Sequence, residues 1–193
     1  MPLSFLALAQ ACAPGVHPAT LERVVRVESS YNPYAIGVVN GKLTRQPNSL
    51  PEAVATVARL EKAGYNYSLG LAQVNKKNLK AHGLTIETAF DPCENLRAGS
   101  QILIDCYETA GSVNPDPQGA LRDALSCYYS GDLKRGHRLG YVAKIERAMD
   151  APRPSSGRRR RDTPQVIPSA DPKSPLPTGS EPNAPNNSSS LLF

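Results

Sequence analysis

The chain has 193 residues, which is enough for one domain with a hydrophobic core and a tail. Residues 1–150 carry 16 Lys and Arg against 14 Asp and Glu, so much of the formal net charge of +5 comes from the remainder. A nearly neutral domain argues against the nucleic-acid-binding class. No window reaches the roughly 18 apolar residues of a membrane span, so none is predicted.

The composition changes near residue 150, which we interpret as the end of the domain. Residues 151–193 hold nine of the 18 prolines, many Ser and Asn, and few aliphatic residues. Such a segment cannot bury enough apolar surface to offset its ordering entropy, so it is predicted to be a disordered tail. We interpret its basic run, Arg158–Arg161, as a solvated charge run rather than a phosphate-binding site.

The first thirteen residues are apolar and uncharged. They resemble a signal-peptide core followed by a cleavage site at Ala11-Cys12-Ala13, but they are short and lack a basic start. We therefore predict a first, buried helix of the folded domain, with export signalled by something else.

Glu28 lies where an amphipathic helix should bury an aliphatic side chain. The predicted helix spans His17–Ser29, and its apolar stripe consists of Leu21, Val24 and Val25. Glu28 takes the i+7 place on that stripe. A carboxylate in apolar surroundings loses hydration, so its pKa should rise, as a general acid requires. The alternative is a helix-end Glu that reaches water or meets an Arg.

A β-hairpin and a helix are predicted next. Ala35–Val39 and Lys42–Arg45 flank Asn40-Gly41, a strong hairpin signal. Ser49 then precedes Glu52 by three residues, which predicts a capping box that opens a helix over 50–63.

Further helices are predicted at Leu71–Ala81, Asn95–Ala110, Gln118–Tyr129 and Leu139–Met149. The sequence therefore predicts a mainly α domain over 1–150 with one small β-hairpin, because no alternating strands could build a larger sheet.

The four cysteines show no metal-type spacing, so no metal site or cofactor is predicted. They are Cys12, Cys93, Cys106 and Cys127. Two disulfides in an oxidising compartment is the favoured interpretation, and four buried free thiols is the alternative. If 95–109 is helical, Cys93 and Cys106 lie roughly 16 Å or more apart, beyond the ~7 Å limit for bridged Cα atoms. Two connectivities remain.

Five short motifs occur in an order that resembles the soluble lytic transglycosylase domain, which is related to goose-type lysozyme. They are Glu28-Ser29-Ser30-Tyr31-Asn32-Pro33, Gly70-Leu71-Ala72-Gln73, Asp91-Pro92-Cys93-Glu94-Asn95-Leu96 with Ala98-Gly99, Tyr128-Tyr129-Ser130-Gly131, and Tyr141-Val142. The resemblance covers nearly all of residues 1–150 and implies a lysozyme-like fold. The expected hairpin and the Cys-Tyr-Tyr-Ser-Gly run look most like the specialised transglycosylase component of type IV secretion systems.

Two positions depart from the family pattern. The family commonly has Met where Ala72 stands, and Tyr-Asn-Ala-Gly where Tyr128-Tyr129-Ser130-Gly131 stands. These departures bear on how sugar is held and leave the acid in place.

The resemblance implies chemistry with one carboxyl group. Most glycosidases hold two carboxylates across the scissile bond, whereas Asp91 and Glu94 are explained as helix-capping residues. Glu28 would protonate the oxygen that links N-acetylmuramic acid to N-acetylglucosamine. It would then accept the proton of the muramic 6-hydroxyl as that oxygen closes onto the anomeric carbon. The product would be a 1,6-anhydro sugar, with the N-acetyl group stabilising the cationic intermediate.

The resemblance also implies six residues around the acid: Ser29, Gly70, Gln73, Tyr128, Tyr129 and Tyr141. Ser29 and Gln73 would hydrogen-bond the substrate. Gly70 would allow close approach of the backbone to sugar. The Tyr141 hydroxyl would meet Glu28. The two adjacent tyrosines would offer apolar faces to sugar rings, or pack in the core.

The implied setting is the periplasm or cell envelope. There a monomer would open peptidoglycan locally for a secretion or conjugation apparatus, with peptidoglycan strands and type IV secretion components as partners. Two alternatives stay open: a hydrolytic, lysozyme-like muramidase, and a non-catalytic peptidoglycan-binding assembly module.

The family's fold also implies a disulfide pairing. It places Cys93 and Cys127 at the active-site end, with Cys12 and Cys106 at the far side. The expected disulfides are therefore Cys93–Cys127 and Cys12–Cys106.

Overall fold

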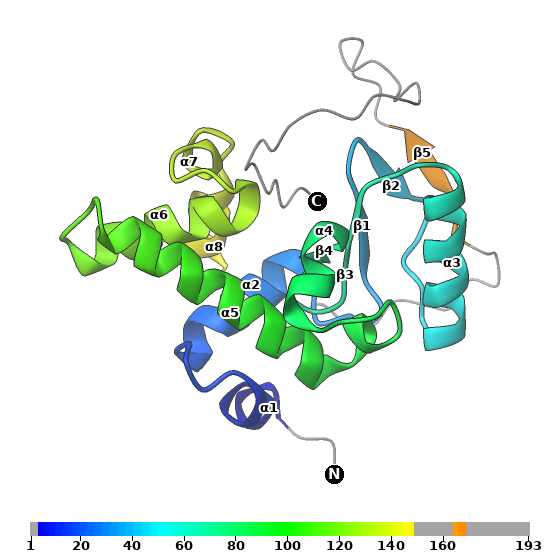
Figure 1. Cartoon of the computed structure of the whole chain (residues 1–193), viewed down its shortest axis with the longest axis horizontal. Helices are drawn as coiled ribbons and strands as arrows, with labels where there is room; N and C mark the ends of the chain where they lie inside the picture. The colour runs from blue at the N-terminus through cyan, green and yellow to red at the C-terminus, as the bar shows by residue number, and fades with distance from the viewer. Residues whose placement is uncertain (1–3, 149–163, 169–193) are drawn as a thin grey trace.

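The computed structural model describes residues 4–148 and 164–168, which form a mostly helical domain with small antiparallel sheets (Figure 1). This confirms the predicted mainly α fold class. In chain order the elements are α1 Phe5–Cys12, α2 Pro18–Ser29, β1 Ile36–Val38, β2 Gly41–Leu43, α3 Leu50–Lys62, β3 Tyr67–Leu69, β4 Val74–Asn75, α4 Lys76–Leu79, the 3₁₀ turns Lys80–His82 and Thr88–Phe90, α5 Pro92–Gly111, α6 Pro117–Ser130, α7 Arg135–Arg138, α8 Tyr141–Arg147 and β5 Val166–Pro168.

Helix α2 carries the central part of the apolar core. Pro18 occupies its first turn, and the His17 ring nitrogen accepts a hydrogen bond from the backbone N–H of Ala19 at 3.2 Å. The predicted stripe is buried, since Leu21, Val24 and Val25 are at most 1% exposed. The helix ends directly after Glu28 and Ser29, because Ser30 and Tyr31 adopt positive φ angles of 50° and 64°.

The strands pair differently from the predicted hairpin. Strand β1 pairs antiparallel with β3, with Ile36 opposite Leu69, and β3 also pairs with β4. Strand β2 pairs instead with β5. The Gln46 side chain explains the difference, because it accepts from the N–H of Ile36 at 2.7 Å and donates to its carbonyl at 3.0 Å. The edge of β1 that β2 would have used is therefore occupied.

Helix α3 begins at the predicted residue without the predicted capping box. Ser49 is the N-cap residue but makes no side-chain capping bond. Glu52 accepts instead from the backbone N–H of Asn48 at 2.9 Å and forms an ion pair with Arg45. The hydrogen bond from Arg45 is the main cause that lowers the pKa of the Glu52 carboxyl.

The segment predicted as the helix Leu71–Ala81 contains β4, α4 and a 3₁₀ turn. Gln73 has a positive φ of 49°, which excludes helix at that point. The helix starts only at Lys76, where the Asn75 side chain caps it.

Helices α5 and α6 extend slightly beyond their predicted bounds, whereas the last predicted helix, Leu139–Met149, begins two residues later, as α8. Asp91 caps α5 by accepting from the N–H groups of Cys93 and Glu94, both at 2.9 Å. Gly140, at φ 76°, separates α8 from the short helix α7 that precedes it, so the helix cannot begin at Leu139. Among the described helices, none combines the length and apolar character needed to cross a bilayer.

Most of the predicted tail, 151–193, lies outside the described residues. Within it, residues 166–168 form β5 on β2, with Leu43 opposite Val166. Arg59 of α3 donates to the Pro164 carbonyl at 3.2 Å, and Thr44 N–H donates to the Gln165 carbonyl at 2.6 Å. Disorder was predicted for this short segment too, and backbone pairing with β2 explains why it is ordered.

Two disulfides form, and the expected pairing is wrong. The bonds join Cys12 to Cys93 and Cys106 to Cys127, with Cα atoms 5.1 and 5.7 Å apart. Helix α1 packs against α5, whose first turn holds Cys93, and the short 112–116 connection turns α6 back beside α5 (Figure 1). Cys93 at the start of α5 therefore lies beside Cys12, and Cys106 further along α5 lies beside Cys127 of α6.

We expect the two disulfides to differ in their contribution to stability. They close loops of 81 and 21 residues. In the chain-entropy model these loops are worth about 4.5 and about 3 kcal/mol. Urea unfolding should therefore show a larger loss for Cys12→Ala/Cys93→Ala than for Cys106→Ala/Cys127→Ala. Equal losses, or a larger one for the second pair, would contradict this ranking.

Candidate active site

A cleft of about 640 Å³ is lined by α2, β1, β2 and the segment 139–144. A cavity of this volume suits a small ligand or a short piece of polymer. Five of the seven predicted site residues line it: Glu28, Ser29, Gln73, Tyr129 and Tyr141. The structure thus brings together side chains from four separate stretches of the sequence.

The Glu28 carboxyl is buried although other atoms of the residue reach the cleft surface. Oε1 accepts a hydrogen bond from the Tyr141 hydroxyl, whereas the buried Oε2 has no hydrogen-bond partner among the described residues. Burial raises the pKa of this carboxyl well above its ordinary value, and it outweighs the opposing effects of Tyr141 and of the Lys144 charge. Glu28 therefore keeps its proton to higher pH than an exposed glutamate.

Tyr129 supports the tyrosine that contacts the acid. Its ring stacks on that of Tyr141, with centroids 4.5 Å apart and planes 17° from parallel. Tyr141 is 4% exposed, whereas Tyr129 is half-buried and lines the cleft. The stack fixes the Tyr141 ring, and through its hydroxyl the orientation of the Glu28 carboxyl.

Ser29 and Gln73 line the cleft but use part of their hydrogen-bonding capacity internally. The Ser29 hydroxyl donates to the Val25 carbonyl at 3.0 Å. The Gln73 side-chain amide donates to the carbonyls of Ala35 and Gly70 at 3.1 and 2.9 Å. Gln73 thus connects the turn after β3 to Ala35, the residue before β1. Only its side-chain oxygen remains available to accept a hydrogen bond from a ligand.

Gly70 and Tyr128 are not among the described residues that line the cleft. Gly70 has a φ of 79°, and a Cβ there would lie 2.3 Å from the Asn95 side chain and 2.5 Å from the Ala89 carbonyl. The Tyr128 hydroxyl donates to the Ala72 carbonyl. Both residues lie behind the cleft wall, where they fix the turn that carries Gln73.

Asn95 is the buried polar residue that completes this turn. Its side chain accepts from the N–H of Ala72 at 2.7 Å and donates to the carbonyls of Leu69 and Ala89 at 2.9 and 2.7 Å. Leu69 ends β3, Ala72 lies in the turn itself, and Ala89 lies in the 3₁₀ turn Thr88–Phe90. The start of α5 thereby holds the turn in place.

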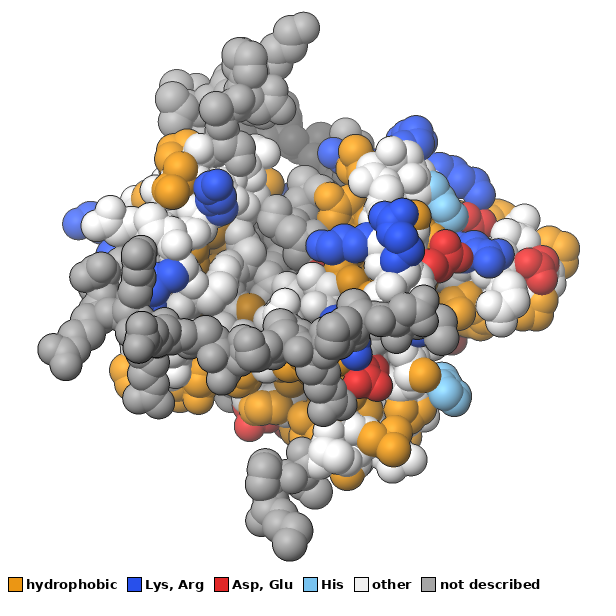
Figure 2. All heavy atoms as spheres, turned by 180° about the vertical axis from the view of Figure 1, so that it is seen from behind, with side chains coloured by type: hydrophobic (Ala, Val, Ile, Leu, Met, Phe, Trp, Pro, Cys, Tyr) orange, Lys and Arg blue, Asp and Glu red, His pale blue; other side chains and the backbone are white. Residues whose placement is uncertain are grey.

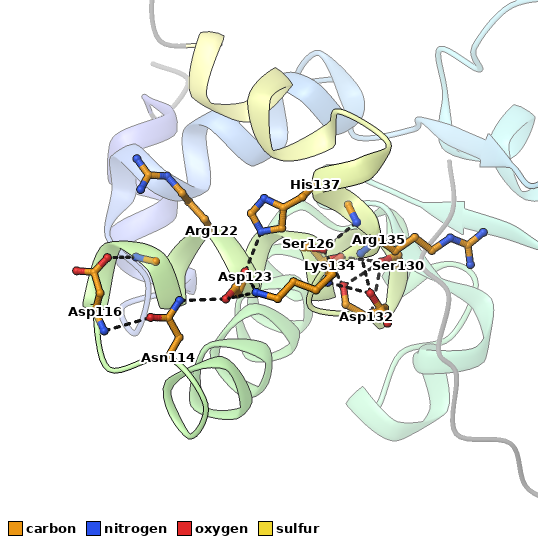
Figure 3. Close-up of polar contacts among 12 residues, drawn as sticks. Asn114, Asp116, Arg122, Asp123, Ser126, Ser130, Asp132, Lys134, Arg135 and His137 are labelled. Carbon is orange, nitrogen blue, oxygen red and sulfur yellow. Dashed lines mark hydrogen bonds and ion pairs between the residues drawn. The ribbon is translucent and has the colours of Figure 1, made fainter.

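A polar network fixes α7 against α6 (Figure 3). Asp123 of α6 is 3% exposed and accepts hydrogen bonds from Asn114, Lys134 and His137 at 2.9–3.1 Å. Burial favours a higher pKa for Asp123, but these donors together outweigh it and lower the pKa. The Ser126 hydroxyl accepts from the N–H of Gly136 at 2.8 Å. Since α7 leads directly into residues 139–141, the network positions that side of the cleft.

Glu28 is the only carboxylate among the described residues that line the cleft. Asp91 caps α5, and Glu94 forms an ion pair with Arg97. Within 4–148 and 164–168, no group of three or more His, Cys, Asp or Glu side chains lies together as a metal site requires. The described lining therefore presents one carboxyl group, that of Glu28.

The lining residues that were not predicted as site residues include these four: Lys42, Gln46, Leu139 and Lys144. None belongs to a motif that indicates chemistry. Lys144 had one usable signal, since it follows Tyr141 by three residues on a helix and so shares its face.

The family described as Transglycosylase SLT domain matches residues 5–148. The type IV secretion system protein virB1 of Brucella suis biovar 1 (strain 1330) is 53% identical over 152 residues, which are 76% of this chain and 64% of that protein. Protein virB1 of Agrobacterium fabrum (strain C58) is 36% identical over 151 residues, covering 76% of this chain and 61% of that protein. The chain thus matches less than two thirds of the length of these relatives. No solved structure matches it at a comparable level of significance.

The family match spans every described element from α1 to α8, including the cleft and its buried glutamate. This chain therefore belongs to the Transglycosylase SLT domain family.

Proposed function

We propose that this chain is a lytic transglycosylase that cleaves the bond between N-acetylmuramic acid and N-acetylglucosamine in peptidoglycan, with formation of a 1,6-anhydro end. The observation that carries the proposal is a single buried carboxyl, Glu28, in a cleft whose described lining holds no second carboxylate. Family membership agrees with it.

Glu28 acts first as the acid. Its raised pKa keeps the carboxyl protonated, and the Tyr141 hydroxyl orients it through Oε1, so that Glu28 can donate its proton to the glycosidic oxygen. As the bond to the anomeric carbon breaks, the leaving sugar departs with a new hydroxyl and the muramic ring becomes cationic.

Glu28 then acts as the base. Its carboxylate accepts the proton of the muramic 6-hydroxyl while that oxygen bonds to the anomeric carbon. The acid is thereby regenerated and no water is consumed. The substrate's own N-acetyl group stabilises the cation between the two steps, in the role that a second carboxylate has in other glycosidases.

A muramidase that uses water remains the second enzymatic candidate, and a wall-binding assembly module the candidate without chemistry. An inverting hydrolase needs a second carboxylate to activate water, and none lines the described cleft. A binding module gains nothing from burying an ionisable group with one oxygen unpartnered, since that burial costs free energy.

The proposed setting is the cell envelope. The Brucella relative is named a type IV secretion system protein. By analogy, we propose that this chain opens the wall locally where such an apparatus assembles.

Glu28→Gln should abolish cleavage while the fold is retained. Without a second carboxylate, activity should fall below about 1% of wild type, a barrier increase of at least about 2.7 kcal/mol. Mass spectrometry of digested muropeptides should show anhydro ends for the wild type and none for the variant. The matched control is Glu108→Gln, an exposed glutamate on α5.

Each product pattern has one meaning. Reducing ends would indicate a hydrolase, and no product from the wild type would indicate a binding module. Residual activity of Glu28→Gln well above 1% would contradict a mechanism with one acid.

Glu28→Gln should also stabilise the protein increasingly as pH rises. An unfolded glutamate titrates near pH 4.3, whereas folded Glu28 holds its proton to higher pH. Between the two values the folded state binds more protons, so wild-type stability falls with rising pH. The Tm of the variant minus that of the wild type should grow from about pH 4 upward and then level off. A constant difference would show that the Glu28 pKa is not raised.

Tyr141→Phe should lower the rate and move the pH profile. The hydroxyl fixes the carboxyl and also lowers the Glu28 pKa, so its loss should move the alkaline limb of kcat/KM to higher pH. Tyr107→Phe, at an exposed position on α5, is the control and should change neither quantity. If Tyr141→Phe lowers the rate but leaves the alkaline limb of kcat/KM unchanged, Tyr141 acts through packing alone and does not change the Glu28 pKa.

A further inference from the structure

Two lysines that line the cleft have no ion-pair partner among the described residues. Lys42 lies on β2 and Lys144 on α8, and both are exposed. Neither forms an ion pair or a side-chain hydrogen bond with any described residue. By contrast, Arg45, Arg122 and Lys134 each pair with a carboxylate. These two lysines are therefore available to a ligand.

The charge of the cleft favours an anion. Its only described acid is Glu28, and the proposed mechanism requires Glu28 to be neutral when substrate binds. The described lining then carries two positive charges and no negative one. Figure 2 shows further Lys and Arg side chains gathered over the part of the molecule that carries α7 and α8. A cationic cleft of this kind attracts and orients anionic groups.

We propose that Lys42 and Lys144 form a binding site for a carboxylate carried by the muramic acid residue of the substrate. This inference rests on the proposed function. The sugar rings themselves are neutral and cannot satisfy these cations. The muramic carboxylate has two sources: the free lactyl group of a stripped strand, and the carboxyl groups of an attached stem peptide.

The positions of the two lysines suit this role. Lys144 follows Tyr141 by three residues on α8, so it lies next to the group that orients the acid. Lys42 comes from β2, a separate element of the cleft lining. The same cleft therefore offers a carboxylate one cation from each of two elements, each on a flexible lysine stem.

Carboxylate binding also assists the acid. The charged or titratable groups that act on Glu28 are Tyr141 and Lys144 of α8 and Tyr128 and Tyr129 of α6. Of these, Lys144 carries a charge that favours ionised Glu28. A bound carboxylate offsets that charge, so Glu28 holds its proton more firmly in the complex than in the free protein.

Binding can be tested without turnover in a Glu28→Gln background, because Gln resembles the neutral acid. Calorimetric titration should use three glycan oligomers: one with stem peptides, one stripped to the free lactyl carboxylate, and one stripped and converted to the neutral lactyl methylamide. We expect the oligomers with carboxylates to bind about threefold to tenfold more tightly than the methylamide, and higher ionic strength to shrink the difference. The tighter of the two anionic oligomers identifies the source of the carboxylate.

Lys42→Met/Lys144→Met should remove this preference, whereas Lys42→Arg/Lys144→Arg should retain it. The matched control is Lys62→Met/Lys80→Met, which removes two exposed lysines outside the cleft lining. The inference is overturned if the methylamide binds as tightly as the anionic oligomers, or if the preference survives in Lys42→Met/Lys144→Met. The muropeptide assay on the wild type judges the proposed function separately, since these affinities do not depend on bond cleavage.

Discussion

The hydrogen bond between the Tyr141 hydroxyl and Glu28 Oε1 is the contact on which the geometry of the site depends. It joins the end of α2 to the start of α8, which are separated by more than a hundred residues of sequence. A buried carboxyl with only one oxygen partnered is unfavourable by itself, so the surrounding fold must hold it in place. On the α2 side, Ser30 and Tyr31 have positive φ angles and end the helix directly after Glu28 and Ser29. On the α8 side, the Tyr129 ring stacks on that of Tyr141.

The other parts of the domain support the walls of the cleft. Asn95 binds three backbone groups behind the turn that carries Gln73, and Asp123 gathers donors that hold α7. Both side chains are buried and hydrogen-bonded, so each holds its neighbouring segment in place. The two disulfides join α1 to α5 and α5 to α6, which ties α5 to its neighbours on both sides.

Local sequence signals predicted most of the helices and the buried glutamate, because a helical stripe is a property of consecutive residues. The Glu28 interpretation needed only Leu21, Val24 and Val25, and all three are buried as expected. The predictions of strand pairing and of disulfide pairing, which depended on distant partners, were wrong. The Asn40-Gly41 turn is present, but β1 pairs with residues 67–69 and β2 with residues 166–168. The Gln46 side chain, which bonds the backbone of Ile36, occupies the edge of β1 that β2 would have used. The disulfides likewise depended on how α1 packs on α5, and Lys42 belongs to no motif.

The pairing of β2 with β5 affects the order in which parts of the domain can fold. Strand β1 pairs with β3, which lies within residues 4–148. Strand β2 instead pairs with residues 166–168. Directly after β2, Thr44 accepts a hydrogen bond from Gln165 across a sequence separation of 121. Contacts of such separation form late, since a long loop must close first. During synthesis or translocation from the N-terminus, the wall that bears Lys42 therefore stays incomplete until the last described residues emerge. For that interval the β2 edge is open to pairing with other strands.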